Sequence, residues 1–326
     1  MAGAYFQKGT GEVKNKPQAV IDLGSHSVLL LIARKEKEKL KPLFEDFAIS
    51  RLGRGLERSA QLTEQRQTET LNILRRFKQK AQEFDCRQID VIATEAMRRA
   101  RNARQFKQRI EQELQLQVKI LSPEQEAIYS YLGAISVIEE FENQPFTVID
   151  VGGGSTEITL GRGGQILQHA SVPVGAARLA ESINFKVKLC SSDRMGLMQI
   201  VKDELEKLSF WNEITPSRVL VGSGGTITTL AAVFHQMKRY DAQIINRTVL
   251  DKEQIWQMYY RMNEMNLAER LKLAGLEAGR EDVITYGMII YLTIMELRQL
   301  PWIRVSAGGV RYGYLLGNLI TESGVH

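Results

Sequence analysis

The chain contains few cysteines and few histidines. Among its 326 residues are two cysteines, Cys86 and Cys190, far apart and outside any C-x-x-C pair, and four scattered histidines. This composition provides no disulfide framework and no Cys/His zinc site. It also excludes the cysteine loop and the His-Asp pair that other phosphate-cleaving enzymes use. Free thiols fit a reducing compartment, so we expect a cytoplasmic protein.

Long hydrophobic runs are also missing. The most apolar stretches, such as VITYGMIIYLTIMEL, are too short and too mixed to span a membrane, so we expect no membrane association. The polar segment 1–16 lacks the features of a secretory signal and is expected to be a disordered tail. Aromatic residues make up only 7% of the chain and do not interleave with its basic clusters, so no nucleic-acid partner is expected.

What is present is ordinary for a soluble globular protein of two domains: 44% hydrophobic and 25% charged residues over a chain of this length. The formal net charge is +5, with basic clusters at 75–80 and 97–109. These clusters are either solvated helix faces or an electropositive surface for a polyanion, for which a phosphate chain or a nucleotide is the best candidate.

Two octets of the sequence match each other. VIDLGSHS spans 20–27 and VIDVGGGS spans 148–155, and both deliver an aspartate from an apolar run into a small, polar turn. Each octet belongs to a three-strand pattern, over 18–48 and from 146 onward, and alternating helices and strands follow both. This repetition predicts a duplicated α/β domain that builds one site from two halves.

The Gly/Ser turns are suited to binding anions. Backbone N–H groups in such a turn can point into one concavity, and glycine lets the backbone approach a phosphate closely. The candidate phosphate-binding residues come from the two octets and from a third turn, GSGG: Gly24, Ser25, His26, Ser27, Gly152, Gly153, Gly154, Ser155, Gly224 and Gly225.

Asp22 and Asp150 end their strands just before these turns. If the two halves face each other, both carboxylates point into the cleft, where they would suit Mg²⁺, a cation that keeps several waters and bridges to phosphate oxygens. Each aspartate could instead simply cap its own turn. Two aspartates in matching octets favour the metal site. A GxxxxGK[ST] loop is missing, so catalysis would use metal, backbone donors and a carboxylate base.

Five segments together resemble the exopolyphosphatase / guanosine pentaphosphate phosphohydrolase (Ppx/GppA) family, within the superfamily of actin-like ATPases and sugar kinases. They are VIDLGSHS, ATEAMRRARN, LSPEQEA, VIDVGGGSTEI and VGSGGTITTLAA, and the resemblance runs from about residue 17 to the end. It implies an α/β fold of two duplicated actin-like (ribonuclease H-like) domains facing an interdomain cleft. The chain looks like the short, two-domain form. We expect the domains to be 17–122 plus 306–326, and 123–305.

The resemblance also implies roles for individual residues. Glu126, rather than its neighbour Glu124, matches the catalytic glutamate that orients or deprotonates the attacking water. Arg98 matches an arginine that could hold phosphate oxygens. Asp150 matches the magnesium-associated aspartate, with Asp22 its counterpart, and Glu157 a position that supports the loop.

Other positions depart from the family pattern. The departures are His26 for a usual Asn, Glu95 for Ser or His, Ile128 for Arg, and Ala307 and Tyr312 near the C-terminus.

The implied activity is Mg²⁺-dependent release of terminal orthophosphate from inorganic polyphosphate or from pppGpp, with a homodimer plausible from the family. Two alternatives stay open: a kinase of the same superfamily, with GSGGTITTLAA as its adenosine loop, and a regulator that binds pppGpp or polyphosphate with little or no turnover.

Overall fold

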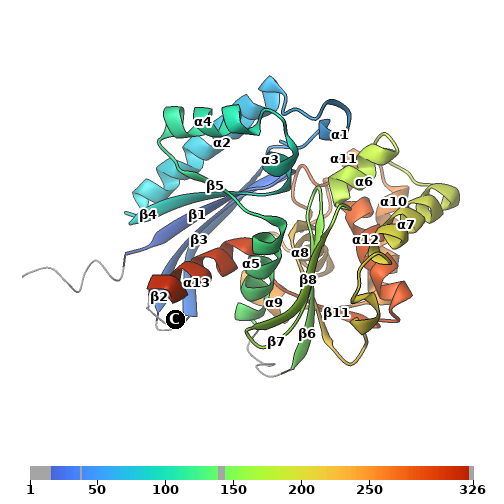
Figure 1. Cartoon of the computed structure of the whole chain (residues 1–326). Helices are drawn as coiled ribbons and strands as arrows, with labels where there is room; N and C mark the ends of the chain where they lie inside the picture. Colours follow the sequence, from blue (N-terminus) through green and yellow to red (C-terminus); the bar gives the residue numbers. More distant parts are fainter. Residues whose placement is uncertain (1–15, 37–38, 139–143, 323–326) are drawn as a thin grey trace, which may run out of the picture.

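The computed structural model describes residues 16–36, 39–138 and 144–322. The chain forms two β-sheets flanked by helices, an α/β architecture in which both sheets begin with the same antiparallel three-strand unit (Figure 1). The expected duplicated α/β fold is therefore confirmed. The expected tail, 1–16, lies outside the described residues except for Lys16.

The first sheet has the strand order β3-β2-β1-β4-β5. Its strands are β1 (Gln18–Leu23), β2 (Ser27–Glu36), β3 (Lys39–Ile49), β4 (Gln88–Ala93) and β5 (Val118–Ile120). Strand β1 pairs antiparallel with β2 and parallel with β4. Because β1 is central and buried on both faces, its sequence QAVIDL is almost continuously apolar up to Asp22.

The second sheet has the order β10-β11-β9-β6-β7-β8. Its strands are β6 (Pro145–Val151), β7 (Thr156–Arg162), β8 (Gln165–Val172), β9 (Val219–Ser223), β10 (Val249–Asp251) and β11 (Trp302–Val305). Strand β6 repeats the position of β1, with β7 antiparallel on one side and β9 parallel on the other. Asp22 and Asp150 therefore occupy equivalent places in the two sheets.

Helices cover both sheets. Their bounds are α1 (Leu56–Ser59), α2 (Glu64–Glu83), α3 (Glu95–Arg99), α4 (Ala103–Leu114), α5 (Pro123–Ser136), α6 (Ala176–Ser182), α7 (Ser191–Leu205), α8 (Gly225–Phe234), α9 (Ala242–Arg247), α10 (Lys252–Glu264), α11 (Leu267–Arg270), α12 (Ile284–Leu297) and α13 (Val310–Glu322). Helices α2 and α4 pack on one face of the first sheet, and α8, α10 and α12 contribute to the core of the second. Below, each sheet with the helices packed on it is called the first or the second lobe.

Two helices lie between the sheets, near the centre of Figure 1. Helix α13 packs on the first sheet through Val310, Tyr312 and Leu315, and α5 packs on the second sheet through Tyr131 and Ala134. The last helix thus lies on the first sheet. The domain limits themselves stay a prediction.

Local sequence signals account for the starts of several helices. Ser122 caps α5, accepting from the Gln125 backbone N–H while the Gln125 side chain accepts from the Ser122 N–H. The sequence Ser-Pro-Glu-Gln predicts this capping box. The sequence over 251–272 has the pattern of one helix, but this segment contains two, α10 and α11, because Asn266 caps a new helix. The Gly/Arg-rich segment 49–62, whose composition predicts a loop, contains the short α1. The sequence pattern does not indicate α9 or β10.

The basic clusters are largely neutralised by nearby carboxylates. Arg75 and Arg109 pair with Glu113, Arg109 also pairs with Glu64, and Lys80 pairs with Glu83. These contacts favour solvated helix faces over an electropositive surface. Among the described residues, no helix is both long enough and apolar enough to cross a membrane.

Candidate active site

The two matching turns face each other across a cavity of about 290 Å³. Every residue predicted to bind phosphate or metal lines this cavity, together with Glu126 and Glu157. Arg98 is the one predicted site residue absent from its lining. The ends of β1 and β6 with the turns that follow them, the first turn of α5, strand β7 and the start of α8 supply these residues, so the structure brings together segments that lie far apart in the chain.

The two turns have the same backbone hydrogen bond. Gly24 N–H donates to the Ser27 carbonyl at 3.0 Å, and Gly152 N–H donates to the Ser155 carbonyl at 2.9 Å. The turns also approach each other: a Cβ added at Gly153 would lie 2.8 Å from the Cβ of His26. A side chain at position 153 would separate the two halves of the site, which explains why this position holds glycine.

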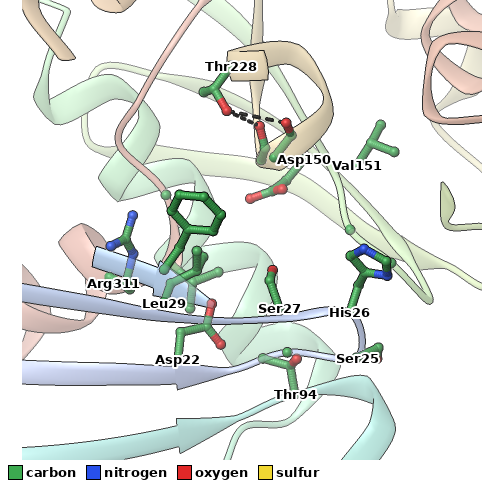
Figure 2. Close-up of a pocket in the computed structure, with 18 of the residues that line it drawn as sticks. Asp22, Ser25, His26, Ser27, Leu29, Thr94, Asp150, Val151, Thr228 and Arg311 are labelled. Atoms are coloured by element: carbon green, nitrogen blue, oxygen red, sulfur yellow. Dashed lines mark hydrogen bonds between the residues drawn. The ribbon is translucent and has the colours of Figure 1, made fainter. Parts of the chain in front are cut away.

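Asp22 and Asp150 reach the cavity from opposite sides (Figure 2). Burial, followed by the nearby Glu126 carboxylate, raises the pKa of Asp22 to about 7. Its Oδ1 atom is buried and has no hydrogen-bond partner. Burial also raises the pKa of Asp150, although Ser130 donates to its Oδ2 at 2.6 Å.

Glu126 lies in the first turn of α5 and is buried. Its Oε2 accepts from Arg98 Nη1 at 2.5 Å, and the same nitrogen donates to the Leu121 carbonyl at 3.0 Å. Burial raises the pKa of Glu126 to about 7, against the opposing effect of Arg98. Arg98 therefore contacts the predicted catalytic carboxylate rather than the cavity itself.

Glu157 is a fourth buried carboxylate near the turns. Its Oε1 accepts from Ser155 Oγ at 2.7 Å and from Ser171 Oγ at 2.8 Å. Burial, with the nearby Glu126 and Asp150, raises its pKa well above the ordinary range. Its carboxylate thereby connects the second turn to β8.

The imidazole of His26 forms a hydrogen bond with the second lobe. Its Nε2 lies 2.9 Å from the Gly279 carbonyl, and burial lowers its pKa to about 4. The ring is therefore neutral near pH 7 and donates to that carbonyl. His26 lines the cavity, but its side chain provides no positive charge for a phosphate.

The sequence analysis assigned no role in the site to several residues that the structure places in or beside it. Ser130 follows Glu126 by four positions, so helical spacing alone would have placed both on one face of α5. Arg311 lines the cavity and lowers the pKa of Asp22. It donates to the Leu30 carbonyl at 2.7 Å. Glu95 and Arg280 also line the cavity, and only the tertiary structure brings them there.

The cavity is strongly acidic. Eight carboxylates line it against two guanidinium groups: Asp22, Glu45, Asp46, Glu95, Glu126, Asp150, Glu157 and Glu277, with Arg280 and Arg311. The raised pKa values of Asp22, Glu126, Asp150 and Glu157 reduce this negative charge, and a cation bound together with an anionic ligand would offset what remains.

Among the described residues, no group of three or more His, Cys, Asp or Glu side chains is arranged to hold a metal ion by itself. The partnerless Oδ1 of Asp22, opposite Asp150, nevertheless fits a cation that takes one or two carboxylates and draws its other ligands from water or phosphate.

Comparison with known proteins identifies the family of this chain. The model of the Ppx/GppA phosphatase family matches residues 31–322. An exopolyphosphatase 2 of Mycobacterium tuberculosis is 27% identical over 291 residues, covering 86% of this chain and 91% of that protein. A bifunctional 3-dehydroquinate synthase/phosphatase of Fusobacterium nucleatum is 29% identical over 310 residues. That match covers 92% of this chain but only 46% of the Fusobacterium protein, so the chain spans about half its length.

Solved structures of similar proteins have the same overall fold. The Aquifex aeolicus member of the Ppx/GppA family superposes with a TM-score of 0.79 at 32% identity, over 95% of this chain and 99% of that one. An exopolyphosphatase from Cytophaga hutchinsonii shares the fold with a TM-score of 0.86 at 22% identity, over 94% and 98% of the two chains. The fold is thus the two-domain, actin-like architecture of these proteins, and the chain belongs to the Ppx/GppA phosphatase family.

Proposed function

We propose that this protein is a Mg²⁺-dependent phosphoanhydride hydrolase that releases terminal orthophosphate from inorganic polyphosphate, from pppGpp, or from both. The observation that carries the proposal is the place of Glu126. It is a buried carboxylate with a pKa of about 7, beside two glycine-rich turns that converge on one cavity. A base with such a pKa is well matched to accepting a proton from water near neutral pH.

In this proposal the turns bind the terminal phosphate. The backbone N–H groups of Gly153 and Gly154 donate to its oxygens. Glu126 orients a water in line with the scissile P–O bond and accepts its proton at a carboxylate oxygen. Arg98, hydrogen-bonded to Glu126 in the structure, positions that carboxylate and keeps it from turning away.

Asp22 and Asp150 would hold Mg²⁺, which when bound neutralises phosphate charge inside an otherwise acidic cavity. The support is the buried, partnerless Oδ1 of Asp22 and the excess of carboxylates over guanidinium groups in the lining. Ser130, which donates to Asp150, fixes that carboxylate and opposes the rise of its pKa on burial.

The test is orthophosphate release in the presence of Mg²⁺ from long polyphosphate, tripolyphosphate, pppGpp and ATP, for the wild type and Glu126→Gln. We expect Glu126→Gln to lower kcat by about 100-fold or more with little change in substrate affinity, because the amide cannot accept the proton. The neighbouring Glu124→Gln is the matched control, since Glu124 is exposed, and it should keep kcat within about twofold.

Either of two results would contradict the proposed hydrolase activity. Phosphate compounds that bind without turnover would favour the regulator instead. Phosphate transfer from ATP to an acceptor, with no release to water, would favour the kinase.

A further inference from the structure

Glu95 lies at the junction between two cavities. It is the first residue of α3 and is buried. It lines the main cavity and also a smaller neighbouring cavity of about 30 Å³, and both cavities share Ser25, His26, Gly153 and Gly154. Glu95 thus lies between the main cavity and the smaller cavity, beside the predicted phosphate-binding turns.

The carboxylate of Glu95 occupies a position built for an anion. Its Oε2 accepts from Ser25 Oγ at 2.7 Å, and its Oε1 lies 2.7 Å from Arg99 Nη1 and 3.9 Å from Arg178 Nη1. A hydroxyl and two guanidinium groups are donors that also bind phosphate oxygens. The carboxylate lies so close to Gly154 that a Cβ there would collide with it.

The smaller cavity has four basic and four acidic side chains. They are Arg51, Arg54, Arg99 and Arg178, with Glu57, Glu95, Glu181 and Asp282. Glu57 shares the arginines with Glu95, binding Arg99 Nη1 at 2.6 Å and Arg178 Nε at 3.0 Å. Of these acids, only Glu95 also lines the main cavity. Its carboxylate therefore separates the arginines from whatever the main cavity binds.

We propose that Glu95 is a specificity-determining residue: its carboxylate fills an anion position between the two turns and closes the arginine-lined cavity to a phosphate chain. A chain that enters the main cavity from solvent then ends at Glu95. Without this carboxylate, a further phosphate group would reach Arg99, Arg178 and the hydroxyl of Ser25. This inference rests on the proposed function, because it assumes that the main cavity binds phosphate chains.

The test measures binding rather than turnover. Titration calorimetry with Mg²⁺ would use tripolyphosphate and long-chain polyphosphate on the full chain, in a Glu126→Gln background so that neither ligand is consumed. The variants added to it are Glu95→Ser, the conservative Glu95→Gln, and Glu57→Gln as control. Glu57→Gln removes the same charge beside the same arginines but leaves the junction closed. Thermal unfolding would show that each variant folds.

We expect Glu95→Ser to tighten binding of long-chain polyphosphate by about tenfold and of tripolyphosphate by less than about threefold. Glu95→Gln, which keeps the volume but loses the charge, should show a smaller gain for the long chain. Glu57→Gln should change neither ligand by more than about threefold.

The inference alone is overturned if wild-type Glu95 in this background binds tripolyphosphate but Glu95→Ser brings no gain for the long chain. It is equally overturned if Glu57→Gln tightens the long chain as much as Glu95→Ser does, because the effect would then be one of general charge. Failure of every variant to bind either ligand would overturn the inference together with the proposed function.

Discussion

The buried carboxylates dominate this protein at the scale of single residues. Asp22, Glu126, Asp150 and Glu157 all have raised pKa values, chiefly because burial disfavours their charged forms. A folded state that holds these protons more tightly than the unfolded chain becomes less stable as pH rises through the raised pKa values. A cation bound between the carboxylates would offset that loss.

The metal-free protein should therefore lose stability between pH 6.5 and pH 8. Asp22 and Glu126, with pKa values of about 7 in the folded state, should each lower the free energy of unfolding by about 1 kcal/mol over this interval. Chemical denaturation in chelator would measure it, and Mg²⁺ should stabilise the protein more at pH 8 than at pH 6.5. Asp22→Asn should reduce both effects, whereas the exposed Glu253→Gln should not. Equal stabilisation by Mg²⁺ at both pH values would contradict the metal site.

His26 should have the opposite pH dependence, in a lower range. Its pKa in the folded state is about 4, so below its ordinary pKa near 6.5 the unfolded chain binds a proton that the folded state rejects. The free energy of unfolding should fall by about 2 kcal/mol between pH 6.5 and pH 5 relative to His26→Asn. Unfolding titrations of the two proteins in parallel would measure this, and parallel pH profiles would show that His26 is not buried as a neutral ring.

At the scale of elements, the contact between α5 and α13 positions the site, since α5 carries Glu126 and Ser130 and α13 carries Arg311. Their backbones touch through glycines: a Cβ at Gly133 would collide with the Gly309 carbonyl, and one at Gly313 with the Tyr129 carbonyl. Close packing of this kind leaves no room for even one methyl group.

Gly313→Ala should therefore cost about 2–3 kcal/mol of stability, because the added methyl forces the two helices apart. The control is Gly196→Ala in α7, where a Cβ would meet nothing within 4 Å and where alanine should stabilise the helix by up to about 1 kcal/mol. Urea denaturation of the two variants would compare them. A neutral Gly313→Ala would show that α5 and α13 can separate at no cost.

At the scale of the whole molecule, polar contacts join the two lobes beside the cavity. Arg51 binds Asp282 at 2.9 Å, the Gly55 N–H donates to Glu181 at 3.1 Å, and His26 binds the Gly279 carbonyl. Arg178 of the second lobe also pairs with Glu57 and Glu95 of the first. These contacts are polar, whereas α5 and α13 pack closely at the centre. Such an arrangement permits the lobes to hinge around the two helices.

Arg51→Ala should accordingly favour an opened arrangement of the lobes and raise KM for phosphate substrates about threefold to tenfold, since substrate would have to close the lobes without this ion pair. Arg66→Ala is the matched control, because Arg66 pairs with Glu69 within α2. Steady-state kinetics and small-angle scattering would test both variants. An unchanged KM together with an unchanged radius of gyration would show that the ion pair does not hold the lobes together.

The sequence by itself determined the longer strands and helices and the pairing of the two halves, but not α1, α9 or β10. The matching octets placed Asp22 and Asp150 at equivalent strand ends, and the Ser122–Gln125 capping box fixed the start of α5 and hence the position of Glu126. These signals are local or repeated, so they can be read without knowing how distant segments pack.

Only the tertiary structure decided which partners these residues meet. Glu95 reaches Ser25 across 70 positions and Arg178 across the cleft, His26 meets Gly279, and Arg98 turns to Glu126 instead of the cavity. Such contacts depend on how the two lobes close on each other, and burial in that closed cleft is what sets the pKa values of the carboxylates. Neither the closing nor the burial is encoded in the spacing of residues along the chain.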